Sequence, residues 1–170
     1  MKRVLILSTI FFLSVAMVSC GGEDKCPDSN KFCYEYASLN WSDISSNSMY
    51  WDAAVTYCEN IGGRIPTISE LRTLIQNCPA TETGGECGVT DDCLSNIDCY
   101  SLSICSGFDS DDSNEYSIFG DKKILWSSSE VPDKDYVYLV DFEFGRVFYY
   151  DKISEPNNVR CVVRQEVGAY

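Results

Sequence analysis

Histidine is absent from this chain of 170 residues. It is the most frequent general base in enzymes, a member of the Ser-His-Asp and Cys-His nucleophile systems, and a common metal ligand. Basic residues are also scarce, since 13 Lys and Arg stand against 26 Asp and Glu. An acidic chain repels phosphate, so we expect no nucleic-acid partner. These shortages exclude most familiar hydrolase mechanisms, and we expect that the protein is not an enzyme.

No apolar run in the sequence reaches the roughly 20 residues that a membrane-spanning helix needs. The longest, Val4 to Val18, is interrupted by polar residues and follows two basic residues, as in the signal peptide of a secreted protein. It ends in Met17-Val18-Ser19-Cys20, which resembles the lipobox of bacterial lipoproteins. We therefore predict a lipoprotein signal peptide at residues 1–19 and lipidation of Cys20. An ordinary secretory signal and a short anchor helix are the alternatives.

The residues after Cys20 indicate a location. Gly21 and Gly22 stand where an aspartate retains enterobacterial lipoproteins in the inner membrane. We therefore expect a bacterial cell-envelope protein attached to the outer membrane through its N-terminal lipid. The expected organisation is a lipid anchor with a tether and an N-terminal hairpin at residues 20–37, one folded domain at 38–164 and a tail at 165–170.

Helical patterns are confined to the first half of the domain. Residues 49–60 carry apolar side chains near helical spacing, and Gly62-Gly63 then ends the pattern. Thr67-Ile68-Ser69-Glu70 is a capping box, which predicts a second helix that reaches about Asn77.

Strand patterns follow in the last third of the chain. They predict strands at 124–127, 136–142, 146–150 and 159–164, with a hairpin that turns at Gly145. Residues 79–121 are too polar for a core of their own, so we interpret them as a long loop region held by disulfides. Helices followed by strands indicate an α+β fold with an antiparallel sheet.

An acidic stretch in the loop region is a candidate metal site. Asp109, Asp111 and Ser113 have the one, three, five spacing of an EF-hand-like calcium loop. The sixth and twelfth positions carry Asn114 and Gly120 instead of Gly and Glu. A solvated acidic loop is the alternative, and calcium is the one cofactor that this sequence brings into question.

An ordered set of motifs covers most of the chain. It resembles the Lcl C-terminal domain family, which is named after a domain of a collagen-like surface adhesin and is related to the C-type lectin-like and formylglycine-generating folds. The resemblance spans roughly residues 38–164 and implies a C-type lectin-like domain. Its motifs are Trp41-Ser42, residues 49–54, Tyr57-Cys58, residues 62–67, Glu70-Leu71, residues 126–129 and residues 159–164.

The resemblance also implies a disulfide between Cys58 and Cys161. Ten cysteines in a short chain are typical of an oxidising compartment, and no Cys-x-x-Cys motif points to a zinc ribbon. Cys26 and Cys33 would close the N-terminal hairpin. An odd number then remains, so one thiol is free, pairs between molecules, or Cys20 is not lipidated. The sequence does not determine how the remaining five cysteines pair: Cys78, Cys87, Cys93, Cys99 and Cys105.

Other acidic motifs carry less information. Glu155-Pro156-Asn157 matches a triplet of mannose-type lectins, but it stands too close to Cys161 and is interpreted as a turn before the last strand. Carboxylate pairs such as Asp91-Asp92, and Asp133 with Asp135, are expected by composition alone in so acidic a chain.

These observations lead to one functional hypothesis and two rivals. We expect a lipid-anchored envelope protein with a lectin-like module that binds a surface glycan or a protein, as in adhesion. Sulfated polysaccharides are not expected, because an acidic domain repels polyanions. A structural lipoprotein without a ligand is the alternative, and a formylglycine-generating-type enzyme is the third reading. Exposed aromatic residues in the loop region would favour binding, and Tyr100 and Tyr116 are the candidates there.

Overall fold

The computed structural model describes residues 26, 30–94 and 116–165. None of the helices in this part of the chain is long and apolar enough to cross a membrane. Within the same residues the chain forms two helices and six strands, in the order β1 (Phe32–Tyr36), β2 (Leu39–Ser42), α1 (Trp51–Asn60), α2 (Ile68–Arg72), β3 (Ile124–Glu130), β4 (Tyr136–Asp141), β5 (Arg146–Asp151) and β6 (Val162–Arg164).

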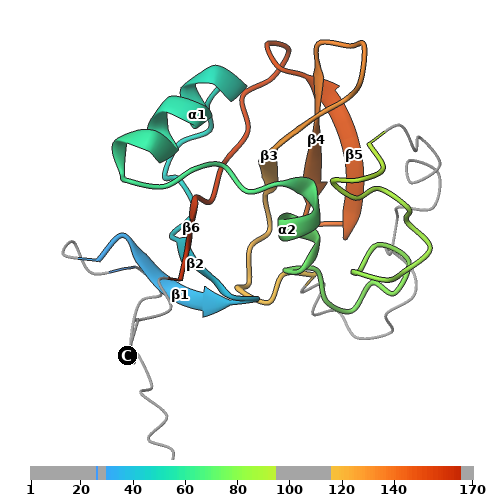
Figure 1. The fold of residues 1–170 in the computed structure, drawn as a ribbon, viewed down its shortest axis with the longest axis horizontal. Helices are drawn as coiled ribbons and strands as arrows, with labels where there is room; N and C mark the ends of the chain where they lie inside the picture. Colours follow the sequence, from blue (N-terminus) through green and yellow to red (C-terminus); the bar gives the residue numbers. More distant parts are fainter. Residues whose placement is uncertain (1–25, 27–29, 95–115, 166–170) are drawn as a thin grey trace, which may run out of the picture.

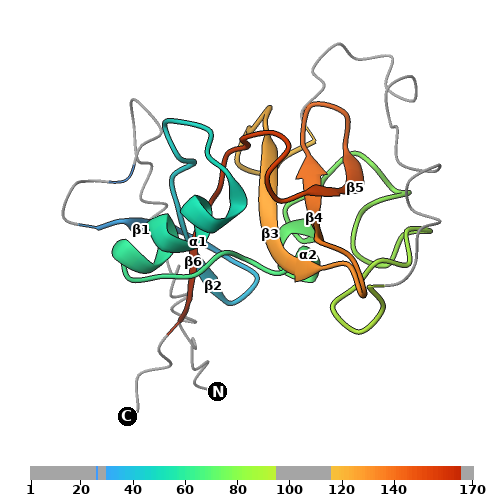
Figure 2. The same cartoon turned by 90° about the horizontal axis from the view of Figure 1, so that it is seen from above.

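The strands form two antiparallel three-stranded sheets, β1-β2-β6 and β3-β4-β5. Figures 1 and 2 show the first sheet and α1 on one side of the molecule and the second sheet on the other, with α2 packed against β3 and β4. The expected α+β class is confirmed. The expected single sheet is wrong, because the last strand, β6, pairs with β2 and not with β5.

The β1–β2 hairpin carries no glycine signal in the sequence. Its turn consists of Ala37 and Ser38, which both have positive φ, at 52° and 62°. A two-residue turn with positive φ at both positions normally contains Asn or Gly. The sequence therefore gives no sign of this turn. The hairpin expected within residues 20–37, from Cys26 and Cys33, did not include β2, which is the strand that pairs with β1.

Both helices are shorter than their patterns predict. Met49 exchanges two backbone hydrogen bonds with Asn157, so α1 begins at Trp51 and not at residue 49. The second helix ends at Arg72, well before Asn77. After Arg72 the backbone pairs with another segment, since Gln76 N donates to Tyr116 O and Ile118 N donates to Leu74 O. Leu74 N still donates to Leu71 O and Ile75 N to Arg72 O, so the chain leaves α2 through a turn. The pairing of Ile75 with Ser117 then ends the helical pattern.

The segment of residues 157–164, which we call the terminal segment, touches both sheets. Asn158 bridges to β3 in parallel, and Val162, the first residue of β6, bridges to Arg64. Cys161 O accepts from Ser42 N, and its side chain forms a disulfide with Cys58 of α1. Because successive residues pair with different partners, the expected strand over 159–164 is reduced to the three residues of β6.

Apolar packing lies on both faces of the β3-β4-β5 sheet. One cluster places Trp126, Val137 and Leu139 against α1 and the Cys58–Cys161 disulfide. The other cluster places Tyr138 and Val140 against α2 and the residues that follow it, where Leu71 and Leu74 are fully buried. Alternation along β4 therefore fills two cores with one strand.

The loop that follows α2 is held by Arg72. Its guanidinium donates to the carbonyl oxygens of Thr81, Val89 and Glu82, and its side chain is 3% exposed. Burial lowers the pKa of Arg72. Cys78 and Cys87, at the two ends of this loop, are both disulfide-bonded and buried. The described part of residues 79–121 is thus irregular, as expected, but it is fixed by a buried cation as well as by disulfides.

The first turn of α2 forms the expected capping box. Thr67 Oγ1 accepts from Glu70 N, and Glu70 Oε2 accepts from Thr67 N at 2.8 Å. Arg64 adds two bonds to the same carboxylate, at 2.7 Å and 2.6 Å. Burial by itself would raise the pKa of Glu70, but the bonds from Arg64 and Thr67 outweigh it and lower that pKa.

The disulfides Cys58–Cys161 and Cys26–Cys33 differ greatly in loop length, with sequence separations of 103 and 7. We predict that Cys58→Ala with Cys161→Ala lowers the free energy of unfolding by about 4 to 5 kcal/mol, because a long loop loses the most entropy on closure. Cys26→Ala with Cys33→Ala should cost about 2 kcal/mol. Urea unfolding of the oxidised proteins measures both, and equal losses would contradict the prediction.

We also predict a pH dependence that belongs to Glu70. Its pKa is lower in the folded chain than the ordinary value of 4.5, so its contribution is complete above that value and is lost as pH falls through the folded-state pKa. Glu70→Gln should therefore lose more stability at about pH 6 than at about pH 3. Glu86→Gln, at an exposed position, is the control, and equal loss at both pH values would contradict the assignment.

Candidate functional site

Three tyrosines meet on one face of the β4–β5 hairpin. Tyr138 of β4 lies directly opposite Tyr149 of β5, and Tyr136 is its diagonal neighbour. The Tyr136 and Tyr149 rings are stacked, with centroids 5.8 Å apart and planes 16° from parallel. The Tyr138 ring meets Tyr149 edge-on at 5.9 Å. Cross-strand aromatic pairs stabilise a hairpin, and here the outer two rings are only half-buried.

Lys134 extends this group from the β3–β4 turn. Val131 N donates to Tyr136 O and Lys134 N donates to Val131 O, while Asp133 occupies the turn at a φ of 60°. The turn places Lys134 Nζ 5.8 Å from the Tyr136 ring centroid and 5.4 Å from that of Tyr149. A cation at this distance from two rings is attracted to both. We call Lys134, Tyr136 and Tyr149 the tyrosine–lysine surface.

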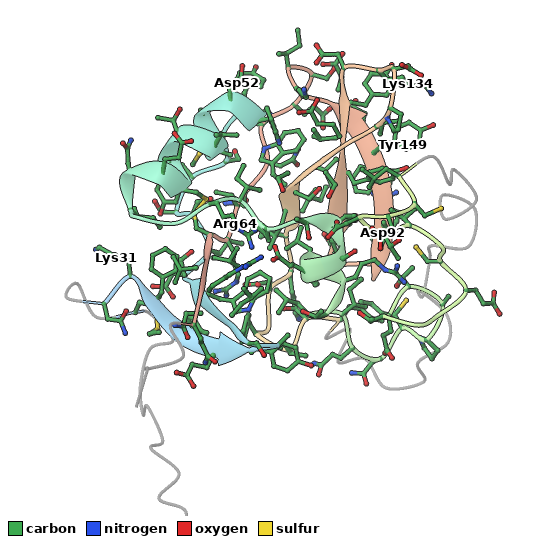
Figure 3. All side chains as sticks on the ribbon, viewed as in Figure 1. Lys31, Asp52, Arg64, Asp92, Lys134 and Tyr149 are labelled. Carbon is green, nitrogen blue, oxygen red and sulfur yellow. A yellow bond between two sulfur atoms is a disulfide. The ribbon has the colours of Figure 1, made fainter. Side chains whose placement is uncertain are left out.

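The buried Tyr138 connects this surface to the loop at residues 91–94. Its hydroxyl donates to Leu94 O. Burial raises the pKa of Tyr138, with smaller contributions from Tyr149 and Cys93. The hydroxyl is therefore a donor throughout the physiological range. Figure 3 shows Lys134, Tyr149 and Asp92 on the side of the molecule that carries β5.

Asp91 fixes the start of the same loop against α2. Its Oδ1 accepts from Ser69 N and from Ser129 Oγ, and Ser69 Oγ accepts from Asp91 N. The loop is thus tied to a helix and to β3 at one end and to β4 at the other. Ligand contacts on a rigid scaffold cost little conformational entropy, and these bonds hold the loop beside the surface rigidly.

The tyrosine–lysine surface presents several groups that can contact a ligand. Two half-buried rings offer flat apolar area together with phenolic hydroxyls, and the ammonium offers three N–H donors. Such a set can contact a ligand that combines an apolar face with hydroxyl or carbonyl oxygens. Among the described residues, no group of three or more His, Cys, Asp or Glu side chains is placed to hold a metal ion.

A concave feature lies elsewhere, beside Arg72. It is an open depression of about 530 Å³ lined by Tyr36, Thr73 and Glu82, among others. Arg72 is its only basic lining residue, and three of the N–H groups of its guanidinium are already bonded to loop carbonyls. The depression therefore offers a ligand less chemistry than the tyrosine–lysine surface does.

Several residues singled out from the sequence lie outside the described residues. They are Cys20, Cys99, Cys105 and Tyr100, together with Asp109, Asp111 and Ser113 of the acidic loop. Tyr116 is described and is 1% exposed, so it belongs to the core and not to a binding surface.

The described cysteines divide into bonded and free ones. The disulfide Cys58–Cys161, which the resemblance implies, is present, as is Cys26–Cys33. Cys78 and Cys87 are bonded, and Cys93 is a free, exposed thiol.

The acidic motifs have structural roles in the described residues. Asn157 pairs with Met49, and its side chain donates to Glu155 O, so Glu155-Pro156-Asn157 is a turn before the terminal segment. Asp135 accepts from Lys152 at 3.3 Å. Asp133 shapes the turn of Lys134.

The tyrosine–lysine surface is not evident from the sequence patterns. Its signal was the alternation Tyr136-Val137-Tyr138, whose tyrosines must share one face of a strand. The alternation does not predict the register that brings Tyr149 opposite Tyr138, because register follows from the turn between the strands.

Comparison with known proteins identifies one family. The family model of the Lcl C-terminal domain matches residues 35–163. This match confirms the resemblance that the motifs suggest. No curated protein and no solved structure matches the chain, so the C-type lectin-like assignment stays a prediction.

Proposed function

The chain belongs to the Lcl C-terminal domain family, and from this premise we propose that it is a lipid-anchored cell-envelope protein whose domain binds a ligand through the tyrosine–lysine surface. Membership in a family named after an adhesin domain is consistent with adhesion. The observation that carries the proposal is the stacked pair of Tyr136 and Tyr149 beside Lys134.

The ligand class that best fits this surface is a neutral glycan. A sugar ring has an apolar face of C–H groups that can lie on a tyrosine ring, and its hydroxyl oxygens can accept from Lys134. Tyrosine gives much contact area for few rotatable bonds, so ordering it on binding costs little. The net charge of −13 opposes polyanionic ligands, whereas a neutral glycan meets no such repulsion.

The location in the cell envelope has separate support. The sequence begins with a signal-peptide pattern that ends at Cys20, and disulfides persist in oxidising compartments outside the cytosol. The described domain holds both Cys58–Cys161 and Cys26–Cys33. A lipid on Cys20 would attach a folded module to a membrane through a short polar tether.

A binding role suits these residues better than an enzymatic one. Without histidine, a formylglycine-generating-type reaction would depend on a cysteine pair at a substrate groove, and the cysteines of the two disulfides named above are used as staples. The rival that shares the envelope location is a structural lipoprotein without a ligand, and glycan binding separates the two.

We predict that Cys20→Ser abolishes the incorporation of labelled palmitate when the gene is expressed in a bacterium with a lipoprotein pathway. The acyl chains attach to this thiol, and stable anchoring needs more than one chain. Membrane fractionation of the variant should show release or an unprocessed precursor. Unchanged labelling would rule out Cys20 as the lipidation site.

We further predict that an array of neutral glycans gives a ligand whose affinity falls about tenfold or more with Tyr149→Ala, which removes one of the stacked rings. Lys134→Ala should weaken binding less. The matched control is Tyr150→Ala, since Tyr150 is the next residue of β5 and points to the other face of the sheet. Equal effects of Tyr149→Ala and Tyr150→Ala would contradict the proposed site, and no binding to the array would favour the structural lipoprotein.

A further inference from the structure

Large apolar side chains are exposed at the end of the molecule where α1 begins. Tyr50 precedes α1 and is 50% exposed, and Ile153 follows β5 and is 69% exposed. A backbone bond from Trp51 N to Lys152 O, at 3.3 Å, joins their neighbours in the chain. Tyr150, 39% exposed, stands two residues before Lys152. We call Tyr50, Tyr150 and Ile153 the apolar apex.

Tyr150 of the apex shares a face of β5 with Phe148, which packs against the cluster that contains α1 residues. Lys152 Nζ, two residues after Tyr150, lies 4.5 Å from the Trp51 ring centroid of α1. Tyr150 is therefore directed to the α1 side of the sheet. The tyrosine–lysine surface lies on the opposite face, because Tyr149 alternates with Tyr150.

The backbone beneath the apex is fixed, so the exposure is not that of a loose loop. Lys152 binds Glu130 at 2.9 Å and Asp135 at 3.3 Å. Side-chain hydrogen bonding to Glu130 and Asp135 outweighs burial and raises the pKa of Lys152. Trp51 Nε1 donates to Ser127 O. Tryptophan and lysine bonds thus hold the start of α1 against the end of the sheet.

Acidic side chains surround the apex. Asp52 follows Tyr50 by two residues, and it is labelled at the start of α1 in Figure 3. Asp151 and Glu155 stand on either side of Ile153, and Asp133 is exposed on the adjacent β3–β4 turn. An exposed apolar patch with a charged rim is typical of a protein interaction site, and the sign of the rim selects the partner.

We propose that the apolar apex binds a protein partner that presents an apolar side chain flanked by Lys or Arg. The apolar contact would supply binding energy from surface removed from water, and the acidic rim would speed association with a basic partner. A second copy of this chain fits poorly, since two acidic rims would face each other. An anionic membrane surface is opposed for the same reason.

The proposal is independent of glycan binding, because the two surfaces lie on opposite faces of one sheet. The proposal predicts that peptides which bind the apex share one kind of composition. When oxidised full-length protein in detergent selects from a display library of short random peptides, the enriched peptides should carry Lys or Arg beside an aromatic or aliphatic residue. Their affinity should fall as salt rises from about 0.05 M to about 0.5 M, because salt screens the rim.

Two variants locate the peptide on the protein. Ile153→Ser and Tyr50→Ser should each weaken binding of the enriched peptides about tenfold or more. Phe144→Ser is the matched control, since Phe144 is 40% exposed on the turn at the other end of the β4–β5 hairpin. Unfolding midpoints of the variants should stay near that of the unchanged protein, because exposed side chains add little to stability.

Three outcomes would overturn the proposal. The first is a set of enriched peptides without basic residues, or peptides that bind Ile153→Ser as well as the unchanged protein. The second is a dimer in sedimentation that Ile153→Ser disperses, which would make a second copy the partner. The third is binding to vesicles of anionic lipid that the same variant abolishes, which would make the apex a membrane contact.

Discussion

Both sheets depend on the terminal segment. One stretch of chain closes β1-β2-β6 as its third strand, runs along β3, and carries the cysteine that is bonded to α1. Its partners come from residues more than a hundred positions earlier as well as from the nearby β3. Such distant pairs must form against a large loop-closure entropy, and the Cys58–Cys161 disulfide removes part of that cost from the unfolded chain. The terminal segment therefore completes the fold, because it joins the first sheet, β3 and α1.

The same closure explains where the two proposed binding surfaces lie. The terminal segment and α1 cover one face of the β3-β4-β5 sheet, while α2 and its loop cover the other. At the end of the sheet next to the β3–β4 turn, these covers leave side chains of β4 and β5 partly exposed. Tyr136 and Tyr149 emerge there on one face, and Tyr150 emerges on the other. The strand alternation that fills two cores in the middle of β4 and β5 thus presents aromatic side chains on both faces at their end.

Local patterns predicted the elements that local interactions determine. The alternation of β4 and β5 and the capping box of α2 could be read from consecutive residues, and they agree with the structure. The extent of α2 could not, because Gln76 leaves the helix to pair with Tyr116, forty positions later. The β1–β2 turn was hidden for another reason, since Ala37 and Ser38 adopt positive φ without the residues that normally signal it. The tyrosine–lysine surface needed both a register and a turn, and neither is contained in any single strand.

The acidic excess of the composition remains at the surface, because burial removes Arg72 and Arg160 together with Asp121 and Asp141. Arg160 and Asp121 form a buried pair with two bonds, at 2.6 Å and 2.8 Å, which removes one charge of each sign from the surface. Arg72 is different, because its buried guanidinium is bonded to carbonyl oxygens and so removes a positive charge alone. Lys152 lies between Glu130 and Asp135, leaving their carboxylates to share one cation. Among the described residues, a ligand therefore meets a surface on which exposed carboxylates outnumber exposed ammonium groups such as that of Lys134. On such a surface one lysine can orient a neutral ligand, but it cannot offset the repulsion of a polyanion.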